Sequence, residues 1–207
     1  MDGVEDHFRV HRWDRPVPRL ALIAVPGEPV RAAARTVQRL LSGAPVRVIP
    51  PEWLHVTAVT LGPADEISPA AYRRWRAVVA AGVAATVWDP LVLGAARAGR
   101  TGVSVGLCGG AEAVTAAGQL ARDTALRMGI PVGGPVPTSP HLGLAYVRED
   151  HPGQQLQAPS SAVGRVSWRV RALRVVHLVQ DTDAGCYRWS VVDELPAGPS
   201  RSVAAER

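Results

Sequence analysis

The sequence contains no lysine and only two cysteines among its 207 residues. Cys108 and Cys186 lie far apart and form no CxxC or Cys/His spacing, which excludes a disulfide scaffold and a structural zinc site. All 23 basic residues are arginines, the net charge is +5, and no run of more than two consecutive basic residues occurs. The chain therefore lacks the footprint of a duplex nucleic-acid binder, although arginine side chains suit a small anionic ligand.

Long apolar runs are also absent. The longest early stretch, Leu20–Val25, is far too short to span a bilayer, and the N-terminus carries acids and a histidine before any apolar run. These features favour a cytoplasmic protein with no membrane partner, and we expect a monomer. His7 and His11 lie in a polar segment expected to be mobile, and no histidine has metal-ligand spacing, so no metal or other cofactor is predicted.

The apolar fraction of 47% is enough for a substantial core. Hydrophobic periodicity and Gly/Pro punctuation predict three helices, at Val30–Leu41, from Ser68 with Pro69 in the first turn to Ala81, and at Glu112–Met128. They also predict strands at Val17–Val25, Val46–Ile49, Leu54–Leu61, Thr86–Leu93, Val103–Leu107 and His141–Val147, and a hairpin of Val166–Gln180 with Tyr187–Glu194.

The order of these elements lacks the strict βαβα alternation of a doubly wound sheet. We therefore predict an α+β fold with largely antiparallel sheets. Residues 1–195 are expected to form a single domain, and residues 196–207 a disordered tail.

Two strand segments carry a histidine near their start. In the first, Trp53, His55 and Thr57 are expected to share one strand face, because side chains alternate; in the second, Ser139, His141 and Gly143 do. If the strands lie side by side, both imidazoles enter one cleft. Such a pair can supply the base and the acid of a phosphodiester displacement, and the Thr57 hydroxyl would bind a non-bridging phosphate oxygen. A single histidine on a strand is more often a packing residue. The hypothesis of a catalytic site therefore depends on the presence of two such histidine segments.

The segments Trp53-Leu54-His55-Val56-Thr57 and Pro140-His141-Leu142-Gly143-Leu144-Ala145-Tyr146 resemble the paired HxT/S motifs of the 2H phosphoesterase superfamily, which includes the RNA 2',3'-cyclic phosphodiesterases also called 2'-5' RNA ligases. The resemblance implies a bilobal fold with pseudo-twofold symmetry, in which two mainly antiparallel sheets and flanking helices surround a central cleft. It also implies metal-independent opening of the 2',3'-cyclic phosphate of a nucleotide or RNA end, with His55 and His141 as the acid–base pair.

One departure concerns the second motif, where Gly143 occupies the position of the family's threonine or serine. Three explanations remain open. Ser139 would supply a substitute hydroxyl; the glycine would make room for a different substrate or admit a backbone contact; or catalysis is lost and the chain is a module that binds an anionic ligand. A biosynthetic enzyme acting on a non-RNA substrate is a further alternative.

Two aromatic residues are candidate ligand contacts. The Trp53 indole would stack on a base, although a half-buried strand aromatic is the more common role. Tyr146 occupies a position where some relatives carry a polar ligand contact, but simple alternation turns it away from the cleft, and only a bulge would return it.

Overall fold

The computed structural model describes residues 3–157 and 166–200. The helices are α1 (His7–Val10), α2 (Glu28–Arg39), α3 (Pro69–Ala85) and α4 (Ala111–Arg127), with short 3-10 turns η1 (Pro51–Trp53) and η2 (Ala64–Glu66). The strands are β1 (Arg19–Ala24), β2 (Val46–Val48), β3 (Val56–Pro63), β4 (Leu91–Ala98), β5 (Gly102–Gly109), β6 (His141–Val147), β7 (Ser167–Trp168), β8 (Ala172–Asp181) and β9 (Cys186–Pro196).

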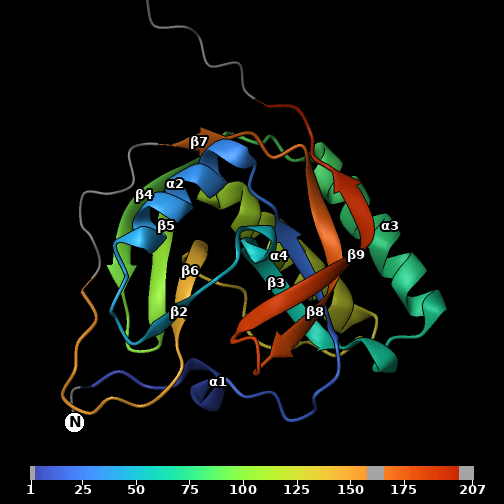
Figure 1. Cartoon of the computed structure of the whole chain (residues 1–207). Helices are drawn as coiled ribbons and strands as arrows, with labels where there is room; N and C mark the ends of the chain where they lie inside the picture. Colours follow the sequence, from blue (N-terminus) through green and yellow to red (C-terminus); the bar gives the residue numbers. More distant parts are fainter. Residues whose placement is uncertain (1–2, 158–165, 201–207) are drawn as a thin grey trace, which may run out of the picture.

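Within the described residues the strands form one curled nine-stranded sheet in the order β7-β4-β5-β6-β3-β1-β8-β9, with β2 paired to β6 (Figure 1). The two predicted sheets are the halves of this sheet, and they meet at a single antiparallel pair, Val56 of β3 with Leu142 of β6. The predicted α+β architecture with largely antiparallel pairing is thus confirmed, and the join of the two halves brings the two histidine-bearing strand starts together.

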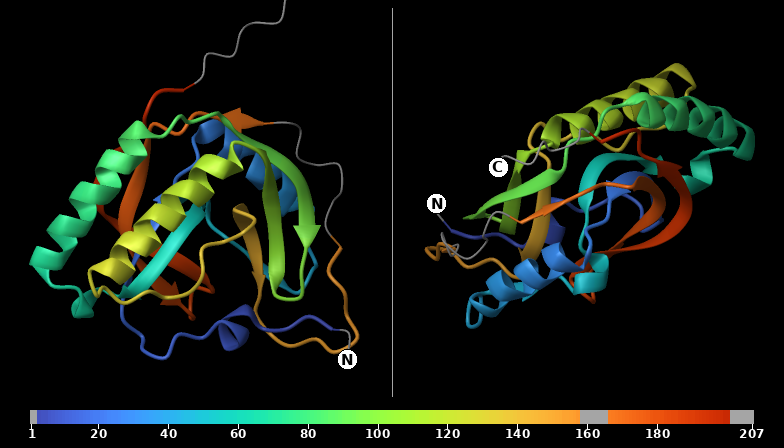
Figure 2. Two further views of the ribbon diagram at one scale, coloured as in Figure 1. Left: turned by 180° about the vertical axis from the view of Figure 1, so that it is seen from behind. Right: turned by 90° about the horizontal axis from the view of Figure 1, so that it is seen from above.

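Helices flank the curled sheet on two sides of the molecule. Figure 2 shows α3 and α4 side by side on one side, with α2 on the opposite side. Ser68 caps α3, because its hydroxyl accepts a hydrogen bond from the backbone N–H of Ala71 at 3.2 Å, and Pro69 occupies the first turn as predicted.

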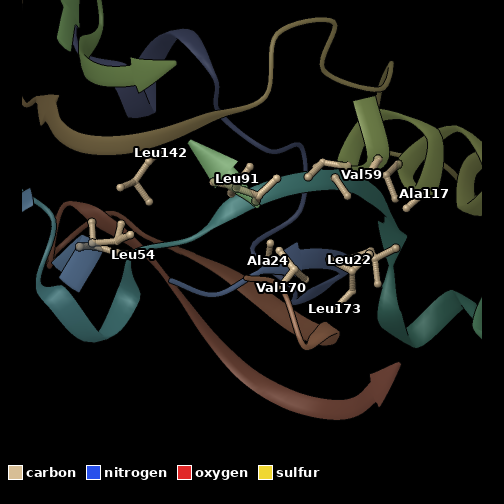
Figure 3. Close-up of a cluster of buried hydrophobic side chains, with 14 of the residues drawn as sticks. Leu22, Ala24, Leu54, Val59, Leu91, Ala117, Leu142, Val170 and Leu173 are labelled. Atoms are coloured by element: carbon tan, nitrogen blue, oxygen red, sulfur yellow. The ribbon is translucent and has the colours of Figure 1, made fainter. Parts of the chain in front are cut away.

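The core lies between the sheet and these helices. Val59 of β3 and Ala117 of α4 meet there, with Leu22 of β1 nearby (Figure 3). Small residues along α4 let the helix approach the sheet closely, and a Cβ on Gly118 would overlap the backbone carbonyl of Ala58. The packing of α4 therefore fixes the position of β3.

Several predicted boundaries are wrong. The strand predicted at Leu54–Leu61 is β3, Val56–Pro63, and it follows the turn η1, so His55 lies just before the strand. The tail does not begin at Pro196, because the backbone N–H groups of Ala197 and Gly198 donate to the carbonyls of Arg171 and Val83. Residues 201–207 of the predicted tail lie outside the described residues.

Candidate functional site

Both motif histidines are held by the same local hydrogen bond. The Nδ1 atom of His55 lies 2.7 Å from the carbonyl oxygen of Trp53, and the Nδ1 atom of His141 lies 3.1 Å from the carbonyl oxygen of Ser139. Because a carbonyl can only accept, each Nδ1 carries the proton. The Nε2 atom of each ring is then free for chemistry.

The pairing of β3 with β6 places these rings on one face. Val56 and Leu142 oppose each other and are fully buried on the core side, so the residues flanking them, among them His55 and His141, belong to the other face. A cleft of about 700 Å³ covers that face and is lined by both histidines and by Thr57. The structure therefore brings the three central predicted residues into one cleft.

The two imidazoles have different environments. His141 is exposed at the start of β6, whereas His55 is partly buried. Burial, and secondarily the charge of His141, lower the pKa of His55, so the neutral form of His55 is favoured near neutral pH. A neutral imidazole whose Nδ1 carries the proton presents a lone pair on Nε2, which is the form that a general base requires.

The other predicted contacts divide into two groups. Tyr146 and Gly143 line a smaller cavity of about 220 Å³ that adjoins the cleft at His141, and Tyr146 lines the cleft as well. A bulge in β6 returns Tyr146 to this face, so the expectation from simple alternation is wrong.

Ser139 and Trp53 do not line the cleft. The Ser139 side chain is exposed, and its contribution is the carbonyl that orients His141. The Trp53 indole packs edge-on against Trp189, with ring centroids 5.8 Å apart, because the turn η1 rotates it off the strand face. Both residues therefore act through their backbone carbonyls in this structure.

The expectation that His7 and His11 lie in a mobile segment is wrong. The N-terminal segment, which contains α1, runs along one end of the sheet, next to the ends of β6 and β8 (Figure 1). Asp150 holds one side of it by accepting from the backbone N–H of Asp6 at 2.8 Å and by pairing with Arg9 at 3.0 Å. On the other side of the segment, the Gln180 side-chain amide donates a hydrogen bond to the carbonyl of His11 at 2.9 Å.

This segment supplies cleft residues that sequence patterns did not reveal. His7 stacks on Tyr146 with ring centroids 4.0 Å apart, and its Nε2 lies 3.3 Å from the Tyr187 hydroxyl. Burial and the neighbouring His11 lower the pKa of His7 to about 3, so the ring is neutral at physiological pH. The His7-x-x-x-His11 spacing was the only local signal, and it does not show which strands the segment crosses.

The same end of the cleft carries positive charge. Arg12 and Arg19 line it together with one carboxylate, that of Asp14, so the arginines outnumber the acid. The Arg19 guanidinium lies 4.7 Å from the centroid of the Trp13 ring. The Arg19 Nε atom is buried without a hydrogen-bond partner among the described residues. These cations favour an anion beside the two histidines.

Across residues 3–157 and 166–200, no group of three or more His, Cys, Asp or Glu side chains is placed to hold a metal ion. In the same part of the chain, none of the helices combines the length and apolar character that a membrane crossing needs.

The fold matches several solved structures. TT0787 of Thermus thermophilus aligns with a TM-score of 0.67 and 19% sequence identity over 87% of this chain and 98% of that chain. E. coli LigT in apo form aligns with a TM-score of 0.61 and 16% identity over 89% of this chain and 99% of that chain. A protein described as a phosphoesterase gives a TM-score of 0.61 and 16% identity over 87% and 99%. No protein-family model and no curated protein matches the sequence.

Proposed function

We propose that this chain, which has the fold of LigT and related 2H phosphoesterases, is a phosphodiesterase that opens the 2',3'-cyclic phosphate of a nucleotide or RNA end by two-histidine catalysis. One observation carries the proposal. Two imidazoles, each anchored through Nδ1 to the carbonyl two residues earlier, line the same cationic cleft. Similar structures of E. coli LigT with 3'-AMP, ATP and phosphate support an anionic, nucleotide-like ligand.

The proposed reaction needs two proton transfers. His55, whose pKa is lowered, accepts a proton from a water molecule through Nε2 while the water oxygen attacks phosphorus. The bond from phosphorus to one ribose oxygen breaks, and His141, acting as an imidazolium that carries a proton on each ring nitrogen, donates its Nε2 proton to that oxygen. The product is a phosphomonoester, and proton exchange with solvent restores both rings. The Thr57 hydroxyl donates to a non-bridging oxygen as charge develops on it.

Incubation with 2',3'-cyclic AMP, followed by phosphorus NMR, tests this proposal. We expect the wild-type protein to convert the cyclic phosphate signal into a monoester signal. His55→Ala and His141→Ala should each lower the rate about 10²–10⁴-fold, because each removes one proton-transfer group.

His177→Ala is the matched control, because His177 lies on β8 and does not line the cleft. It should keep the wild-type rate, and circular dichroism should show that all three variants are folded. Full activity of either cleft variant would contradict the proposal. A cyclic nucleotide that binds without ring opening would instead favour a binding module.

A further inference from the structure

Strand β6, which begins at the cleft residue His141, contains one extra residue relative to its partner strand β5. Its register with β5 shifts by one residue between Gly143 and Ala145, which makes Leu144 the bulged residue. Leu144 and Ala145 are both buried, so the alternation of faces is inverted beyond the bulge. As a result, Tyr146 returns to the face that carries Gly143.

A buried glutamine holds this bulge in place. The side-chain amide of Gln38, on α2, donates to the carbonyl oxygens of Leu144 and Ile49 at 2.9 and 2.8 Å. The backbone N–H of Ile49 donates to the same Leu144 carbonyl at 2.9 Å. If the bulge were removed, the buried Gln38 amide would lose its hydrogen bond to the Leu144 carbonyl. Because a buried polar group without a partner is costly, these bonds stabilise the bulged conformation.

The Tyr146 hydroxyl lies where a side chain at position 143 would extend. A Cβ built on Gly143 would lie 3.3 Å from Tyr146 Oη and 3.1 Å from Ile49 Cδ1. A serine or threonine at this position would therefore compete with the tyrosine for the same space. The φ angle of Gly143 is not positive, so the backbone itself does not require glycine.

The phenol is fixed and available as a donor. Its ring packs against His7 at 4.0 Å, Phe8 at 5.5 Å and Tyr187 at 5.7 Å between centroids. Burial raises the pKa of Tyr146, so the hydroxyl keeps its proton at physiological pH. Within the described part of the chain, no protein group forms a hydrogen bond with this hydroxyl, and the ring lines both cavities beside His141.

We propose that the Tyr146 hydroxyl replaces the hydroxyl that is missing at Gly143 and donates a hydrogen bond to a non-bridging oxygen of the bound phosphate. Residues 143 and 146 then form a coupled pair, in which glycine is needed because the tyrosine occupies its side-chain space. This inference rests on the proposed function, since it names a second contact to the same phosphate. Under this proposal the phosphate contact that is missing at Gly143 is supplied by Tyr146, so glycine at this position does not mean that binding is lost.

Tyr146→Phe tests the hydroxyl alone, because phenylalanine keeps the ring stacked on His7. We expect the dissociation constant for inorganic phosphate, measured by isothermal titration calorimetry, to rise at least about tenfold, and kcat/KM for 2',3'-cyclic AMP to fall about 10²–10³-fold. Tyr72→Phe is the matched control: Tyr72 lies on α3, outside the cleft, and its hydroxyl donates to Asp193 at 3.4 Å. It should change neither quantity.

A double-mutant cycle tests the coupling of the two positions. Gly143→Ser alone should weaken phosphate binding, because the new side chain meets the Tyr146 hydroxyl and Ile49. The double variant Gly143→Ser/Tyr146→Phe should bind phosphate more tightly than Tyr146→Phe, because removal of the phenol oxygen makes room for the serine hydroxyl.

Two results would overturn the inference: wild-type phosphate affinity in Tyr146→Phe, or a double variant that binds no better than Tyr146→Phe. The phosphate titration requires no turnover. If the wild-type protein leaves 2',3'-cyclic AMP intact, the proposed reaction is wrong, while the titration still decides whether Tyr146 contacts phosphate.

Discussion

Acidification from pH 7 to pH 5 should destabilise the folded chain through His7. Burial against Tyr146 and Tyr187, together with the nearby His11, lowers the pKa of His7 from its ordinary value of 6.5 to about 3. A group whose folded-state pKa is depressed in this way stabilises the fold fully above its unfolded-state pKa. That contribution is lost progressively as the pH falls from 6.5 toward 3.

The magnitude follows from the protons taken up on unfolding. Below pH 6.5 the unfolded chain binds a proton at His7 that the folded chain does not bind, which costs about 1.4 kcal/mol for each pH unit. At pH 5, about 1.5 units below the ordinary value, the free energy of unfolding should fall by about 2 kcal/mol from this residue. His55, whose pKa is also lowered, adds to the same trend.

Urea unfolding followed by circular dichroism at pH 7 and pH 5 measures this loss. The comparison is between wild-type protein and His7→Phe, which keeps an aromatic ring against Tyr146 and removes the titrating group. Because His55 is present in both proteins, the difference between their pH dependences isolates His7. The wild-type protein should lose about 2 kcal/mol more than the variant. Equal losses in the two proteins would refute the buried, neutral state assigned to His7.

Two further predictions concern the base and the core. Because burial lowers the pKa of His55, kcat/KM for 2',3'-cyclic AMP should decline on the acid side with a midpoint below pH 6.5, and a midpoint above 6.5 would contradict His55 as the base. Gly118→Ala should lower the free energy of unfolding by about 1–3 kcal/mol, because the new methyl group meets the rigid carbonyl of Ala58. Gly82→Ala, whose methyl group meets only the end of the Leu120 side chain, should cost less than about 1 kcal/mol, since alanine also favours the helix. If the two glycine variants were equally destabilised in urea, contact with the Ala58 carbonyl would not be the cause of the loss at Gly118.

Local patterns in the sequence determined much of the fold and the centre of the site. Strand β6 begins at His141 and ends at Val147, as predicted, and α3 begins at Pro69 after the Ser68 cap. These features were predictable because alternation and capping involve residues close together in the chain. The two histidines were identified for the same reason, since each belongs to a short motif.

The rest depended on contacts between residues far apart in the chain. Gln38 lies 106 positions from Leu144, the residue that it holds in the bulge, and that bulge turns Tyr146 toward the cleft. Likewise, the N-terminal segment reaches the cleft because Asp6 bonds to Asp150, 144 positions away. No local periodicity encodes which distant carbonyl or carboxylate will satisfy a given N–H group. The sequence by itself therefore determined the two histidines and their strands, whereas only the tertiary structure decided which other side chains line the cleft with them.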